Sequence, residues 1–282
     1  MAGSSMKSIK LRIKSVQSTM QITHAMQLVA TSKLRRSKER MEQSKSYAGI
    51  AGEAVKAVLS ACKDEHIAFA QKREVKKRCY VIIAGERGLA GGYNNNIFKA
   101  VQAMDDGTPY CVLPIGRKAI EKYQHLGVEL LNTEHAHVEG LPVGACFTLA
   151  RMLAEGYEKG DFDELILVHT SFINMMSQEV VSDRLLPVEQ PESKDPRLVS
   201  TVFDPNPEET LKSIIPPYIA GRLYAAACDA FASEISARRN AMDSATKNAG
   251  EMISDLQLKY NRARQGAITQ EITEIVAGSE GS

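Results

Sequence analysis

The sequence predicts a mixed α/β fold in which a central, open, Rossmann-like α/β domain lies between two long terminal helices that form an antiparallel coiled coil. Three observations lead to this prediction. All ten prolines lie between Pro109 and Pro217, so long uninterrupted helices are allowed at both ends of the chain. Apolar residues recur at heptad spacing in both proline-free ends. Strand-like and helix-like segments alternate between those ends, as in α/β domains.

The N-terminal helix is expected over residues 1–60. Its seam residues are separated by steps of four and three: Ile9, Ile13, Val16 and Met20. Ile22, Met26 and Val29 then continue the seam on a stripe that is shifted around the helix. Periodicity alone leaves a second arrangement open, in which the terminal helices pack on the central domain instead of on each other.

The central α/β domain is expected over residues 76–190. Apolar runs predict strands at "RCYVII", "PYCVLPIG", "DELILVHTSF" and "QEVVSDRLLPVE". Helical patterns separate the first three runs, at "NNIFKAVQAM", "RKAIEKYQHLG" and "GACFTLARMLAEGYEKG". This alternation predicts an open and largely parallel sheet.

A proline-rich, acidic connector is expected over residues 191–215, followed by the C-terminal helix over residues 216–282. The pair Pro216-Pro217 is predicted to open this helix, because a proline in the first turn loses no intrahelical hydrogen bond. A helix over 218–276 would be roughly 85 to 90 Å long, which exceeds a compact domain of this size. Its predicted seam consists of Ile235, Met242, Ala245, Ala249, Met252 and Leu256. Its last part, "LQLKYNRARQGAITQEITEIVAG", is expected to expose little apolar surface.

Composition limits the classes of function. The 282 residues carry a formal net charge of +1, and 44% of them are hydrophobic. Five cysteines are scattered singly, which predicts neither a disulfide framework nor a zinc site and favours a reducing compartment. The start resembles no signal peptide, and no window predicts a direct membrane span. The first fifty residues are nevertheless strongly basic, which favours an acidic partner.

Two features could serve as catalytic or binding sites. The glycines of "GERGLAGG" follow a strand and precede a helix, where a phosphate could bind, but they match neither the dinucleotide nor the P-loop fingerprint. The histidines of "TEHAHVEG" could join nearby carboxylates, yet a polar surface loop is the favoured interpretation. No catalytic centre, cofactor or metal is predicted. A nucleotide-dependent α/β enzyme and a basic coiled coil that binds nucleic acid stay as alternatives.

Several motifs resemble those of a known family. These are "RIKSVQSTMQITHAMQLVATSKL" near the start, "RGLAGGYNNNI" and "PIGRKA" in the central part, and "SARRNAMDSATKNAGEMISDLQLKYNRARQGAITQEITEIVAG" at the end. Together they resemble the γ subunit of the bacterial F-type ATP synthase, in that family's order and over essentially the whole chain. The terminal run is the most specific: Asn261, Arg264, Gln265, Ile268, Thr269, Glu271, Ile272, Glu274 and Ile275.

The resemblance implies a central-stalk rotor without a catalytic site or cofactor of its own. Its terminal coiled coil would turn inside a ring of three α and three β subunits and couple ion flow through the membrane ring to ATP synthesis or hydrolysis on β. The implied partners are the α and β subunits, the ε subunit and the membrane c-ring, with no nucleic acid. The implied location is peripheral, on the cytoplasmic face of the cell membrane.

The resemblance also implies roles for individual residues. Contacts with β subunits would come from Met26, Arg35, Arg36, Lys38, Arg264, Gln265, Thr269 and Glu271. The shaft would include Arg238, Met242, Met252 and Leu256. The foot that meets the c-ring and ε would include Phe203 and Asp204.

Overall fold

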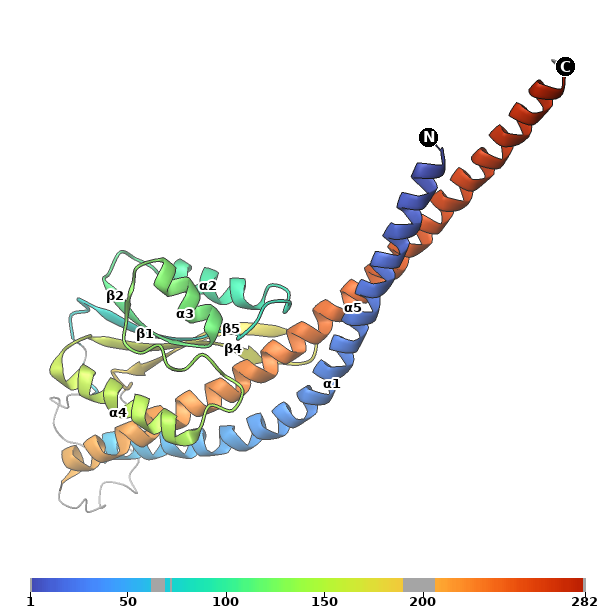
Figure 1. Ribbon diagram of the computed structural model, residues 1–282. Helices are drawn as coiled ribbons and strands as arrows, with labels where there is room; N and C mark the ends of the chain where they lie inside the picture. Colours follow the sequence, from blue (N-terminus) through green and yellow to red (C-terminus); the bar gives the residue numbers. More distant parts are fainter. Residues whose placement is uncertain (1, 62–68, 72, 190–205, 281–282) are drawn as a thin grey trace. The chain divides into compact units, whose positions relative to one another are not determined.

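Two compact units make up the chain in the computed structural model, which describes residues 2–61, 69–71, 73–189 and 206–280 (Figure 1). One unit comprises Met1–Thr31 and Arg238–Ser282, and the other comprises Ser32–Ala237. Two long helices contribute to both units: α1 (Ala2–Ala61) and α5 (Pro207–Glu280).

The larger unit contains a five-stranded sheet in the order β3-β2-β1-β4-β5. Its strands are β1 (Arg78–Ile83), β2 (Tyr110–Ile115), β3 (Glu129–Leu130), β4 (Glu164–Phe172) and β5 (Gln178–Leu186). β1 pairs in parallel with β2 and β4, and β2 pairs in parallel with β3, whereas β4 and β5 are antiparallel. The short connection from β4 to β5 explains this exception, because a parallel pair needs a long crossover. The predicted open, largely parallel sheet is confirmed, with β3 as a short strand that was not predicted.

Helices cover both faces of the sheet. They are α2 (Tyr93–Ala103), α3 (Arg117–His125) and α4 (Val143–Lys159). Alternate residues of β1 belong to different cores: Val81 and Ile83 pack with α4, while Tyr80 and Ile82 pack with α2 and α3. This separation follows from the two-residue period of a strand, and it explains why the central strands read as continuous apolar runs.

Parts of both long helices complete the core on the α4 face. Val55, Val58 and Leu59 of α1 are buried there, together with Ile215 and Leu223 of α5. The two arrangements left open by periodicity are therefore both present. In this unit the long helices pack on the domain, and in the other unit they pack on each other.

The predicted start of the C-terminal helix at residue 216 is wrong, because α5 begins at Pro207. The Asn206 side chain caps it by accepting a hydrogen bond from the Glu209 backbone N–H at 2.9 Å, and Pro207 occupies the first helical position. Pro216 and Pro217 lie inside the helix. Burial of the flanking apolar residues Ile215 and Ile219 offsets the backbone hydrogen bonds that these prolines remove.

Gly116 makes the turn from β2 into α3. Its φ is +96°, and a Cβ at this position would collide with the carbonyl oxygen of Ala84. Its N–H donates to the His135 carbonyl oxygen at 2.8 Å, while the Ala84 N–H donates to the Ile115 carbonyl oxygen at 2.9 Å. Two chain segments therefore meet here at a distance that only glycine permits.

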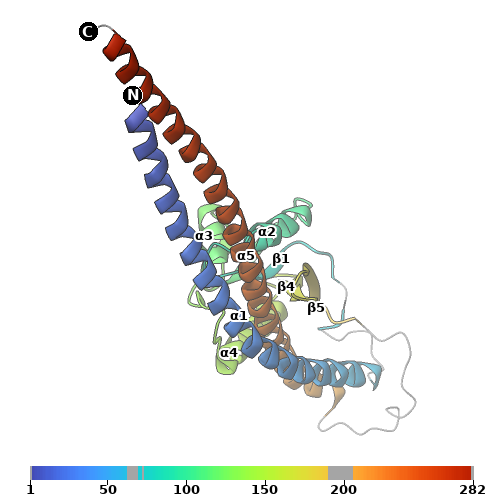
Figure 2. The same ribbon diagram turned by 90° about the vertical axis from the view of Figure 1, so that its right-hand side faces the viewer.

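The smaller unit is an antiparallel helix pair, as predicted (Figures 1 and 2). Two polar contacts fix the register of α1 on α5. The Thr23 and Thr246 hydroxyl oxygens are 2.8 Å apart, and the Gln27 amide donates to the Asp243 carboxylate, also at 2.8 Å. Asp243 accepts a further hydrogen bond from the Lys247 ammonium, and this bond is the main reason that the pKa of Asp243 is lowered.

These polar residues correct the predicted seam. Ile22 and Val29, which were expected to continue it, are about 60% exposed, whereas Thr23 is buried. On α5, Met252 is 46% exposed and Ile253 takes the buried position in its place. Met242 is buried and Leu256 is half-buried, and their place in a shaft stays a prediction. The seam keeps its regular steps of four and three through these polar residues. The predicted seam differs from it because that prediction used apolar residues only.

Candidate interaction surface

The outer end of α5 has no α1 neighbour. Thr23 faces Thr246 and Gln27 faces Asp243, so each step toward the start of α1 is a step toward the end of α5. The start of α1 at Ala2 then falls opposite residue 267 or 268, and α5 continues beyond it (Figures 1 and 2). Every side chain described from 268 to 277 is exposed.

Polar side chains at this end are available to a partner. Arg264, Gln265 and Glu271 are exposed, and the described residues offer their side chains no hydrogen bond or ion pair. Thr269 is different, because its hydroxyl donates to the Gln265 carbonyl oxygen within the helix at 3.0 Å. Arg264 and Gln265 can therefore bind another molecule without losing a contact inside the chain.

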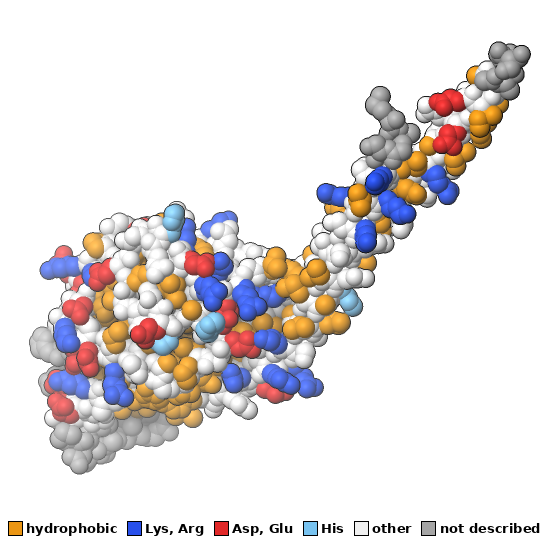
Figure 3. All heavy atoms as spheres, in the orientation of Figure 1, with side chains coloured by type: hydrophobic (Ala, Val, Ile, Leu, Met, Phe, Trp, Pro, Cys, Tyr) orange, Lys and Arg blue, Asp and Glu red, His pale blue; other side chains and the backbone are white. Residues whose placement is uncertain are grey.

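An exposed apolar stripe lies on the same end of α5, where apolar side chains are visible in Figure 3. Its residues are separated by steps of four, three and one, and their exposed fractions range from 47% to 71%: Ile268, Ile272, Ile275 and Val276. The expectation of little apolar surface is wrong, because the average composition of this segment hides its helical spacing. A helix face of this kind is typical of a surface that packs against other chains.

Gly266 weakens this end of α5. It is exposed and helical, and a Cβ at this position would meet no atom within 4 Å. Gly266→Ala should therefore stabilise the helix by up to about 1 kcal/mol, because alanine loses less backbone entropy. Thermal unfolding of the free chain, followed by helical circular dichroism, should show a raised melting temperature. An unchanged or lowered melting temperature would contradict the prediction. Gly221→Ala is the opposite control, because its Cβ would meet the Tyr47 ring at 2.8 Å.

The basic residues grouped as one face of the N-terminal helix point in different directions. Arg35 is exposed, Arg36 lines a cavity of the larger unit, and the Lys38 ammonium lies 4.8 Å from the centre of the Phe172 ring. Successive helical residues differ by about 100°, so these three positions cannot form one stripe. Their contact with a β subunit stays a prediction, as does that of Met26, which is half-buried in the smaller unit.

The remaining predicted residues lie elsewhere. Arg238 is half-buried in α5. Phe203 and Asp204, the predicted foot, lie outside the described residues.

The glycine-rich turn does not offer an open phosphate site. A Cβ at Gly85 would lie 2.9 Å from the carboxyl carbon of Glu234, whose side chain is buried. The Gly85 N–H is already bonded to the Asn94 side-chain oxygen at 2.8 Å. The side chains of Glu234 and Asn94 therefore fill the space beside this turn that a phosphate would have to occupy. This geometry supports the interpretation of a tight turn and disfavours the nucleotide-dependent enzyme.

The histidines do not assemble a reactive site within the described residues. His137 lies in an exposed loop, with Nδ1 3.3 Å from a Glu86 carboxylate oxygen. His169 is buried, and its burial lowers its pKa despite Asp229, whose nearest oxygen is 4.0 Å away. Asp229 is itself held by the Phe172 N–H at 2.8 Å and by Ser171 at 3.0 Å. No group of three candidate metal ligands occurs in the described part of the chain.

Over the described ranges, no helix combines the length and the apolar character that a bilayer span requires.

Comparison with known proteins gives consistent matches over nearly the whole chain. The family model described as ATP synthase matches residues 5–281. The ATP synthase gamma chain of Ruminococcus albus is 44% identical over 282 residues, which cover 97% of each chain. That of Moorella thermoacetica is 40% identical over 278 residues, which cover 98% of each. The sodium ion specific gamma chain of Acetobacterium woodii is 37% identical and covers 96% of this chain and 97% of its own.

Solved structures show the same fold. A chain of the Euglena gracilis mitochondrial ATP synthase, from an OSCP/F1/c-ring structure in rotational state 3, superposes with a TM-score of 0.69. The two chains are 16% identical, and the match covers 99% of this chain and 95% of the other. A chain of the Tetrahymena thermophila central stalk and c-ring structure matches with a TM-score of 0.60 at 23% identity, over 79% of this chain and 99% of the other.

Proposed function

This chain belongs to the ATP synthase gamma-chain family, and from that membership we propose that it is the central-stalk rotor of an F-type ATP synthase. It couples ion flow through the membrane ring to ATP synthesis or hydrolysis at the sites of the β subunits. It contributes no catalytic group of its own.

The observation that carries this proposal is the outer end of α5. It holds an exposed apolar stripe next to Arg264 and Gln265, and the described chain covers neither. Full burial of an isoleucine side chain contributes about 1.5 to 3 kcal/mol relative to leaving it in water. An exposed stripe of several such side chains is therefore consistent with burial by other chains. A ring of α and β subunits supplies a sleeve of this kind.

A helix pair inside such a ring has a direct mechanical use. Three β sites of identical sequence differ in state only if something breaks their equivalence, and one shaft cannot touch three subunits alike. Arg264 and Gln265 then bond to one β subunit at a time. A charge-assisted hydrogen bond contributes about 1.5 to 3 kcal/mol, which is small enough to break at each step of rotation.

The other proposed contacts follow the family resemblance. Thr269 and Glu271 extend the α5 contact with β, and Met26, Arg35, Arg36 and Lys38 meet β from α1. Phe203 and Asp204 form the foot that meets ε and the c-ring. The assembly then lies on the cytoplasmic face of the cell membrane, with this subunit attached peripherally.

Reconstitution tests the function directly. We expect a stable assembly with stimulated, cooperative Mg-ATP hydrolysis only when α and β subunits are mixed with this chain. The matched control is the same chain ending at residue 260, which keeps the larger unit and most of the helix pair but lacks the exposed end. A chain that neither joins the assembly nor changes its rate of hydrolysis would overturn the proposal.

A further inference from the structure

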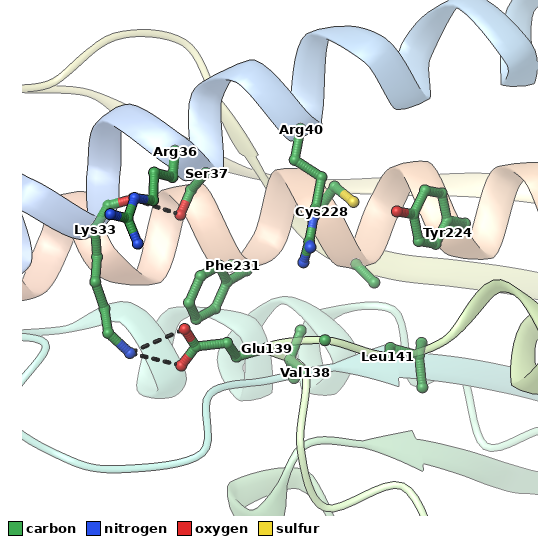
Figure 4. Close-up of a pocket in the computed structure, with 12 residues that line it drawn as sticks. Lys33, Arg36, Ser37, Arg40, Val138, Glu139, Leu141, Tyr224, Cys228 and Phe231 are labelled. Carbon is green, nitrogen blue, oxygen red and sulfur yellow. Dashed lines mark hydrogen bonds and ion pairs between the residues drawn. The ribbon is translucent and has the colours of Figure 1, made fainter.

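A cavity of about 230 Å³ opens in the larger unit between α1, α5 and the loop that precedes α4 (Figure 4). One face of α1 and one face of α5 form two of its walls, with lining residues at steps of three, one and three along each helix. The α1 wall consists of Lys33, Arg36, Ser37 and Arg40. The α5 wall consists of Tyr224, Ala227, Cys228 and Phe231, and the loop adds residues 138–141.

The α1 wall carries an excess of positive charge. Lys33 is neutralised, since its ammonium donates to both carboxylate oxygens of Glu139, at 2.9 and 2.7 Å. Arg36 and Arg40 have no hydrogen bond or ion pair with the described residues, although both line the cavity. The Ser37 hydroxyl is already used, because it donates to the Lys33 carbonyl oxygen at 2.9 Å. Within the described part of the chain, the guanidinium groups of Arg36 and Arg40 are thus left without an anion.

Arg40 is directed into the cavity from α1. Figure 4 shows its side chain extending past Cys228 toward the loop. Burial raises the pKa of Tyr224 and of Cys228, and the nearby Arg40 charge opposes both shifts. The Arg40 charge therefore lies close to these two groups on the opposite wall.

The opposite wall is mostly apolar. Ala227, Cys228 and the ring of Phe231 form it, and Leu141 of the loop adds to it. The cavity is therefore cationic on one side and flat and apolar on the other. A metal ion would be repelled by the first side, and a neutral apolar ligand would take both guanidinium groups out of water without a partner.

We propose that this cavity binds the phosphate group of a small molecule, with Arg36 and Arg40 as the donors. A guanidinium presents parallel N–H groups that match two phosphate oxygens. A water occupies about 30 Å³ in the liquid, so the cavity has room for a phosphate and part of an attached group. This role goes beyond the rotor function, and it does not use the outer end of α5.

Titration of the purified full chain, by calorimetry at constant ionic strength, tests the site. The probes are inorganic phosphate, ADP, and acetate as a singly charged carboxylate. We expect saturable binding of the phosphate probes and weaker binding of acetate. ADP binding more tightly than phosphate, with Phe231→Ala removing the difference, would identify a phosphate carried by an organic group. Equal affinities would identify free phosphate.

Three variants separate this site from general attraction to a basic helix. Arg36→Gln with Arg40→Gln should weaken binding by about tenfold or more, as expected for lost charge-assisted hydrogen bonds. Arg35→Gln, which removes a neighbouring charge outside the cavity, should leave binding nearly unchanged. Glu139→Gln should strengthen binding several-fold, because it releases Lys33 and removes the one carboxylate among the described residues that line the cavity.

The Glu139→Gln chain is expected to gain affinity for phosphate, whereas a misfolded chain would lose it. This variant therefore separates an effect on the site from an effect on folding. Four results would overturn the proposal. They are the absence of saturation by either phosphate probe, an equal loss in the Arg35→Gln chain, a loss rather than a gain in the Glu139→Gln chain, and stronger binding of acetate than of phosphate. The last of these would favour an acidic peptide as the ligand.

Discussion

Replacing Arg264 and Gln265 together by alanine is expected to lower ATP turnover by the assembled complex by about tenfold or more. The reason is that charge-assisted hydrogen bonds of about 1.5 to 3 kcal/mol would be lost at the proposed contact with a β subunit. The isolated chain should be unaffected, because neither side chain has a partner among the described residues. Steady-state hydrolysis by purified complexes measures the effect.

The matched control removes the same two residue types from the same helix. Gln257 and Arg262 are exposed and, like the tested pair, have no side-chain contact with the described residues. The Gln257→Ala, Arg262→Ala chain should support turnover much closer to that of the unaltered chain. Full turnover by a correctly assembled complex that carries the Arg264 and Gln265 changes would remove these residues from the mechanism. Unaltered melting of the free variant chains must accompany either result.

Gly116→Ala is expected to destabilise the larger unit by about 3 kcal/mol or more. A non-glycine residue at positive φ is strained by roughly 1 to 2 kcal/mol, and here the new Cβ also collides with the Ala84 carbonyl oxygen, so β1 and the turn must move apart. Denaturant unfolding of the purified chain, followed by the signal of the α/β unit, measures the loss.

Gly107→Ala separates the two causes. Gly107 has a similar φ of +86°, but its Cβ would meet no atom within 4 Å. It should therefore show the backbone strain alone, roughly 1 to 2 kcal/mol. Equal losses at the two positions would mean that the close approach of the Ala84 carbonyl oxygen adds nothing.

The sheet could be predicted because its signal is local. β1 and β2 are buried on both faces, so each appears as a short, continuous apolar run between turns. β3 has only two residues, Glu129 and Leu130, which is too short for any periodicity. The start of α5 also had a local signal, in which Asn206 and Pro207 precede two glutamates. Pro216-Pro217 offers a second signal for a helix start, and two adjacent prolines favour the later position in the sequence.

The candidate sites depended on different kinds of information. Arg264 and Gln265 could be selected from their motif, and their exposure agrees with a contact role. The apolar stripe around Ile272 could have been found from its spacing alone. The cavity beside Arg40 could not, because its walls come from three segments that the fold brings together from distant parts of the sequence. The polar seam residues Thr23 and Gln27 could not be predicted, because their place in the seam is evident only from Thr246 and Asp243, to which they hydrogen-bond on the other helix.

Those polar members bear on how the helix pair responds to force. If α1 slid along α5 by one heptad, about 10.5 Å, Asp243 would lose Gln27 and face an apolar position such as Met20. Asp243 would keep Lys247 on its own helix but lose Gln27 across the pair, so shear between the helices breaks a specific contact at a defined point. Bending and twisting break neither contact, provided that the two helices move together. Sliding of one helix along the other is therefore opposed by specific polar contacts that joint bending and twisting leave in place, as a shaft that turns as one piece requires.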